Sequence, residues 1–132
     1  MEKRGRSRGD DLMMLSLAHA SRYHWGLVGT PLNKAVGDWQ ISRVYAALGE
    51  PELALRYAKM TLVACEENGL GEIVPTAYEA VARAYAIAQD RKRAGEHLSK
   101  ARRLLDRLPI GKRDREVFLG QIEDTQRLID EI

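Results

Sequence analysis

The sequence predicts an all-α fold of about six antiparallel helices, and three observations support that prediction. Apolar residues recur every three to four positions along most of the chain, which is the spacing of amphipathic helices. No segment alternates between polar and apolar residues over the length of a strand. Proline and glycine separate the periodic segments at short intervals, which predicts helical hairpins within one domain of 132 residues.

The start of the chain is basic. Four positive charges fall within residues 1–10, and we expect this stretch to form a disordered leader. The apolar run that follows, ending at Ala18-His19-Ala20, resembles a signal peptide, but Asp10 and Asp11 interrupt the pattern. A cytoplasmic location is therefore expected. Elsewhere acidic and basic residues are interleaved, and the formal net charge of +2 argues against nucleic acid as a partner.

The first helical segment, residues 11–27, is apolar around nearly its whole circumference, so it must be covered on more than one side. It could lie between the following helices and the C-terminal helix, or between two subunits. Arg22 falls within one of its apolar stripes, where a charge needs a partner. We expect Arg22 to be paired and partly buried, with Asp38 or Glu79 as its partner.

Turn residues place the other helices. Thr30-Pro31 combines a capping hydroxyl with proline at the first helical position. Gly49-Glu50-Pro51 ends one helix and starts the next within about three residues, which predicts an antiparallel hairpin. Gly69 and Gly71 bracket the next break, and Pro109-Ile110-Gly111 forms the last one. The predicted helices cover residues 11–27, 31–48, 51–68, 73–89, 91–107 and 112–131.

An internal duplication appears when the chain is shifted against itself by 40 residues. The identical pairs are Arg43 and Arg83, Tyr45 and Tyr85, Ala46 and Ala86, and Ala54 and Ala94. Tyr57 also falls on His97 at this offset. Small and aromatic residues at contact positions are what stacked helical hairpins require, so we interpret the pattern as a repeat.

The run from Trp39 to Leu55 resembles a tetratricopeptide repeat. It has a small residue three positions before Tyr45, Gly49 at the turn and an alanine five positions beyond that glycine. The second copy is similar but carries Gln89 where the turn glycine is usual. The resemblance implies a short right-handed array within residues 11–132. Its parts would be repeats over residues 31–69 and 72–108 and a terminal helix over 112–131.

The resemblance also implies a binding scaffold rather than a catalyst. In such arrays the first helix of each hairpin lines a concave surface, which here carries Trp39 and Arg43, then Glu79 and Arg83. Members of each pair are four residues apart and share a helix face. An arginine beside an indole suits cation–π contact, and paired arginines suit carboxylates, so we expect an acidic protein or peptide partner. The alternative interpretation is an internal Glu79–Arg83 ion pair, with Trp39 packed against the first helix.

A second function remains open. Arg22, His24, Trp39 and Arg43 could build a pocket for a small anionic ligand in a regulatory or sensory domain. No nucleophile–base set, phosphate loop, cofactor motif or metal-ligand pattern is evident, so neither an enzyme nor a cofactor is expected. His19 and His24 are five residues apart and point about 140° apart on a helix. Cys65 lies on an apolar stripe and is interpreted as a core residue.

Self-association is expected because stacked repeats are marginal below about three copies. Two repeats and one preceding helix therefore need further burial, and a homodimer would supply it. The first helix or the surface around Trp39 is the expected seam. No apolar run approaches the roughly 20 residues that a membrane span needs, so no membrane partner is expected.

Overall fold

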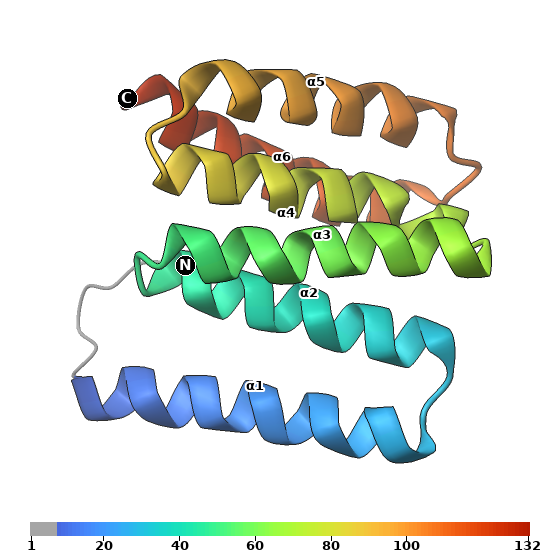
Figure 1. The fold of residues 1–132 in the computed structure, drawn as a ribbon. Coiled ribbons are helices and arrows are strands. Elements are labelled where there is room, and N and C mark those ends of the chain that lie inside the picture. The colour runs from blue at the N-terminus through green and yellow to red at the C-terminus, as the bar shows by residue number, and fades with distance from the viewer. Residues whose placement is uncertain (1–7) are drawn as a thin grey trace.

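The computed structural model describes the backbone of residues 8–132, and their side chains except at 8–10, 12 and 24–28. Six α-helices occupy this part of the chain, and it contains no strand, so the predicted all-α class is confirmed (Figure 1). The helices are α1 (Arg8–Val28), α2 (Pro31–Ala47), α3 (Pro51–Asn68), α4 (Val74–Ile87), α5 (Arg91–Arg107) and α6 (Lys112–Asp130). A short 3₁₀ turn, Gly71–Ile73, precedes α4. Residues 1–7, most of the expected basic leader, lie outside the described part.

Capping and turn residues set the helix ends close to the predicted positions. Thr30 caps α2, because its hydroxyl accepts a hydrogen bond from the Asn33 amide at 3.3 Å. Gly69 ends α3 in the left-handed conformation at φ 63°. The largest difference at these ends is in α1, which begins at Arg8 rather than at residue 11.

The helices form a sequential stack with α1 at one end and α5 and α6 at the other (Figure 1). The pairs α2–α3 and α4–α5 are antiparallel hairpins, and α6 packs against both helices of the second one. α2 also contacts α4, and α4 contacts α6, so these three helices form one row through the stack. Within the described residues α1 packs mainly against α2, and its His19 also reaches Tyr57 of α3. It has no contact with α6, so it does not lie between the repeats and α6.

The two hairpins reproduce each other at the 40-residue offset, including the backbone of the turn. The Glu50 amide donates to the Tyr45 carbonyl at 2.9 Å, and the Asp90 amide donates to the Tyr85 carbonyl at the same distance. Gly49 has φ 74° and Gln89 has φ 66°, so glutamine occupies the left-handed position that glycine fills in the first hairpin. The duplication inferred from the sequence is therefore present in the structure.

Side chains around the repeated tyrosines also correspond. Tyr45 stacks on Tyr57 with ring centroids 5.8 Å apart, and Tyr85 lies 5.2 Å from the His97 ring. Ala54 and Ala94 are both fully buried, which lets the two helices of each hairpin approach closely. Tyr45 and Tyr85 thus have matching surroundings, as a repeat requires.

Candidate binding face

The predicted binding residues come together on the row formed by α2, α4 and α6. Trp39 and Arg43 lie one turn apart on α2, and Glu79 and Arg83 lie one turn apart on α4. The helical spacing puts each pair on one face, and the contact between α2 and α4 brings the faces together. α6 adds Gln121 and Thr125, which sequence reasoning did not single out.

Glu79 is the centre of a buried polar cluster. Its side chain is 1% exposed, and one carboxylate oxygen, Oε1, accepts from Arg43 Nη1 at 3.0 Å. The other oxygen, Oε2, accepts from Arg83 Nε at 3.3 Å and from the Thr125 hydroxyl at 3.0 Å. The internal Glu79–Arg83 pair of the alternative interpretation is therefore confirmed, and Arg43 shares the same carboxylate.

Two guanidinium groups meet one carboxylate in this cluster, so it carries one surplus positive charge. The Arg83 side chain is 6% exposed, and its Nη2 also donates to the Gln121 backbone carbonyl at 3.4 Å. Arg43 is more accessible, with 18% of its side chain exposed. Burial, followed by repulsion from Arg83, lowers the pKa of Arg43, and attraction to Glu79 and to Asp124 opposes that shift. The surplus charge at Arg43 is thus poorly solvated.

Trp39 lies between this cluster and an apolar environment. The Arg43 guanidinium carbon is 5.2 Å from the centre of the indole, which is a cation–π distance. The other neighbours of the ring include Ala58 of α3 and Ala80 and Val81 of α4. These partners belong to α3 and α4, the third and fourth helices, whereas the alternative interpretation expected the first helix.

Arg22 is paired, as expected. Its Nε donates to Asp38 Oδ1 at 2.8 Å, and the two side chains are 27% and 7% exposed. Gly37 makes room for this contact, because a Cβ on Gly37 would lie 2.7 Å from Arg22 Cδ. The His24 side chain lies outside the described residues, so the pocket proposed from Arg22 and His24 is not described in full.

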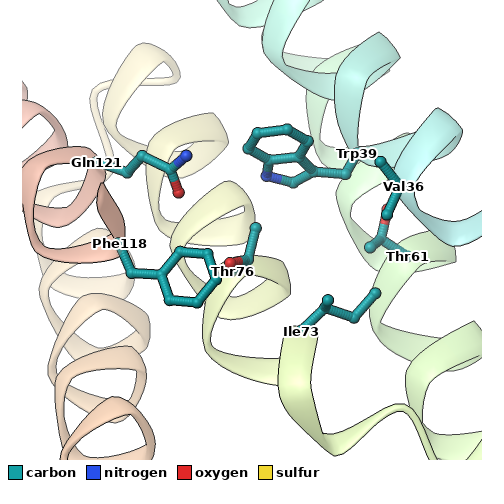
Figure 2. A pocket seen from close by; sticks show the side chains of 7 residues that line it. All are labelled: Val36, Trp39, Thr61, Ile73, Thr76, Phe118 and Gln121. Carbon is teal, nitrogen blue, oxygen red and sulfur yellow. The ribbon is translucent and has the colours of Figure 1, made fainter. Parts of the chain in front are cut away.

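A pocket opens beside Trp39 on the same row of helices. It has a volume of about 130 Å³ and is lined by Val36, Trp39, Thr61, Ile73, Thr76, Phe118 and Gln121. Figure 2 shows Trp39 from α2 on one side and Gln121 and Phe118 from α6 on the other, with Thr76 of α4 between them. The lining contains no charged side chain. Trp39 is the one lining residue that the sequence singled out.

One further polar contact, which the sequence did not predict, joins α1 to the first hairpin. His19 Nε2 lies 3.0 Å from the Tyr45 hydroxyl, and the His19 ring packs edge-on against both Tyr45 and Tyr57. Tyr23 lies four residues from His19 on α1, a spacing at which two side chains can form a hydrogen bond, but the Tyr23 side chain is largely exposed. A one-turn spacing within a helix is visible in a sequence, whereas a contact across helices is not.

Among the described residues, no three His, Cys, Asp or Glu side chains are grouped to hold a metal ion. No described helix has the length and apolar character required to cross a membrane. Comparisons with protein-family models, with curated proteins and with solved structures gave no match.

Proposed function

We propose that the protein is a non-catalytic, cytoplasmic interaction scaffold of tetratricopeptide type that binds an acidic protein or peptide segment. The binding face is the row formed by α2, α4 and α6 around Arg43. The observation that carries the proposal is the surplus positive charge of the Arg43–Glu79–Arg83 cluster. A carboxylate from a partner would balance that charge. Asp124 also attracts Arg43, but its carboxylate is already paired with Arg127 at 2.8 Å.

The geometry favours a carboxylate at Arg43 rather than at Arg83. Arg83 is nearly buried and is held by Glu79 and by the Gln121 carbonyl. Arg43 is partly exposed, and its hydrogen bond to Glu79 uses only Nη1. Its guanidinium has five N–H donors in a planar fork, so further donors remain for a carboxylate. The Trp39 ring lies 5.2 Å from the guanidinium carbon and supports it by cation–π contact.

A peptide array tests whether the protein binds acidic peptides through Arg43. We would probe an array of random peptides that vary in the number of Asp and Glu residues and in whether the C-terminus is free or amidated. We expect retention to rise with the number of carboxylates, to fall with added salt, and to drop about tenfold for Arg43→Gln.

The matched control is Arg103→Gln, which removes the same charge from an exposed position on α5. It should bind the acidic peptides as the unmodified chain does. Equal losses in the two variants would show that net charge alone governs binding. Retention that is independent of peptide acidity would also overturn the proposal.

Self-association is part of the same proposal. Met13 and Leu17 lie one turn apart on α1, and their side chains are 66% and 65% exposed. α1 packs mainly against α2, and the side that carries Met13 and Leu17 is not covered by any other part of the chain that the structure describes. Adjacent exposed apolar residues on a helix suit contact with the same face of a second copy, as in a two-fold symmetric dimer.

A further inference from the structure

The pocket beside Trp39 contains three buried polar atoms that have no hydrogen-bond partner among the described residues. They are the indole Nε1 of Trp39, the hydroxyl oxygen of Thr76 and the amide oxygen Oε1 of Gln121. All three residues line the pocket (Figure 2). Buried polar groups in folded proteins are nearly always paired, so three unpaired ones at a single pocket point to a missing partner.

The types of these atoms define the chemistry of that partner. Trp39 Nε1–H can only donate, so it requires an acceptor. Gln121 Oε1 can only accept, so it requires a donor, and the Thr76 hydroxyl can do either. A hydroxyl group on a ligand both donates and accepts, so it matches this set of atoms.

The rest of the pocket defines the body of the ligand. Val36, Ile73 and Phe118 supply apolar walls, and no charged side chain lines the space, which excludes an ionised ligand. The volume of about 130 Å³ is close to that of an engineered apolar cavity of about 150 Å³ that accepts benzene. One aromatic ring, or an aliphatic body of similar size, therefore fits.

We propose that this pocket binds a small uncharged alcohol of about the size of phenol. Its apolar body would lie against Phe118, Ile73 and Val36, and its hydroxyl would bond with Trp39, Thr76 and Gln121. Arg43 does not line this pocket, so the site is distinct from the carboxylate site at Arg43 and does not depend on it.

The test compares phenol with toluene, which has the same shape without the hydroxyl. The indole N–H of Trp39 gives its own signal in a ¹⁵N NMR spectrum, and loss of that signal in Trp39→Phe assigns it. We expect phenol to shift this signal saturably and to bind more tightly than toluene. Absence of a saturable shift up to the solubility limit of phenol would overturn the proposal.

Two threonines of the same pocket supply matched variants. The Thr61 hydroxyl is already satisfied, because it donates to the Tyr57 carbonyl at 2.9 Å. The Thr76 hydroxyl has no described partner. We expect Thr76→Val to weaken phenol binding about threefold to tenfold while leaving toluene binding unchanged, and Thr61→Val to preserve the preference for phenol. Equal effects of the two substitutions would contradict the proposed contacts.

A third variant tests whether the probes bind inside this space. Val36→Phe adds a ring to the wall of the pocket, so it should abolish the binding of both phenol and toluene. The circular dichroism spectrum and the melting temperature show whether this variant folds. If it does not fold, the Thr76→Val and Thr61→Val variants still test the proposal. Undiminished phenol binding by folded Val36→Phe would place phenol elsewhere and reject the site.

Discussion

Glu79 shows how one residue can link three helices. Its carboxylate accepts hydrogen bonds from Arg43 on α2, from Arg83 on α4 and from Thr125 on α6. A buried carboxylate is expensive to desolvate unless its lone pairs are satisfied, and here both oxygens have partners. Removal of the negative charge would leave two guanidinium groups close together with reduced solvation.

The first prediction follows from that repulsion. Glu79→Gln keeps the shape of the side chain but removes the charge, so we expect the free energy of unfolding to fall by about 3 kcal/mol. Urea denaturation monitored by circular dichroism measures the change. Glu123→Gln, at an exposed position of α6, is the matched control and should change stability by less than about 0.5 kcal/mol. If Glu79→Gln left the free energy of unfolding unchanged, the two arginines would not depend on this carboxylate.

Cys65 illustrates a titratable group in an apolar setting. The side chain is 1% exposed, and burial, followed by the nearby Glu66 carboxylate, raises the pKa of the thiol from 9.0 to about 11. The thiol must lose its proton at a lower pH in the unfolded chain than in the folded one. Stability contributed by the protonated thiol is therefore complete below about pH 9 and is lost as the pH rises to about 11.

The second prediction is an alkaline loss of stability that depends on Cys65. Between pH 9 and 11 the unmodified chain should lose about 2–3 kcal/mol more than Cys65→Ala, because each pKa unit corresponds to about 1.4 kcal/mol. Urea midpoints measured at intervals of half a pH unit for both chains provide the comparison. Parallel pH profiles would show that the thiol titrates alike in the folded and unfolded states.

At the scale of elements, the two hairpin turns differ in one informative residue. Gly49 and Gln89 both adopt positive φ, where a residue with a Cβ is strained and glycine is not. Both positions are exposed, so packing does not complicate the comparison. The absence of the usual turn glycine in the second repeat did not change the turn, because the surrounding hydrogen bonds are the same.

The third prediction is a pair of opposite effects at these turns. Gln89→Gly should raise the free energy of unfolding by about 0.5–1 kcal/mol, and Gly49→Gln should lower it by a similar amount. Thermal or urea denaturation of the two single variants and of the double variant measures these changes in the free energy of unfolding. If Gln89→Gly destabilised the chain, a contact of the glutamine side chain would have to outweigh its backbone strain.

α1 carries Met13 and Leu17 on a face that no other described residue covers. The fourth prediction is that Leu17→Lys shifts a dimer to a monomer, because a charge in the centre of an apolar contact is costly to desolvate. Light scattering after size-exclusion chromatography gives the mass directly. Val63→Lys on α3, also half exposed, is the matched control and should leave the mass unchanged. A monomer at micromolar concentration in the unmodified chain would rule out the proposed dimer.

At the scale of the whole molecule, the stack places the two candidate binding sites on one row of helices. α2, α4 and α6 contact one another in sequence, and residues from all three form both the Glu79 cluster and the pocket beside Trp39. Trp39 contributes to both sites, because Arg43 lies over its ring and the same side chain lines the pocket. Occupation of the pocket by phenol is therefore a means of testing whether the two sites influence each other.

The candidate site was only partly predictable. Trp39, Arg43, Glu79 and Arg83 follow from helical spacing and from the 40-residue duplication, and the structure brings them together. The α6 residues Thr125, Gln121 and Phe118 carry no motif, so nothing in the sequence distinguishes them from ordinary helix positions. Their roles depend on where α6 crosses α4.

The sequence by itself determined the helices, their ends, the duplication and the need of Arg22 for a partner. These features depend on local periodicity, on capping and turn residues, and on the cost of placing a charge in an apolar stripe. Only the tertiary structure decided that Asp38 pairs with Arg22 and that one carboxylate serves two arginines. It also decided that a pocket forms between α2, α3, α4 and α6. The reason is that contacts between helices depend on their crossing and register, which are set by packing over the whole stack.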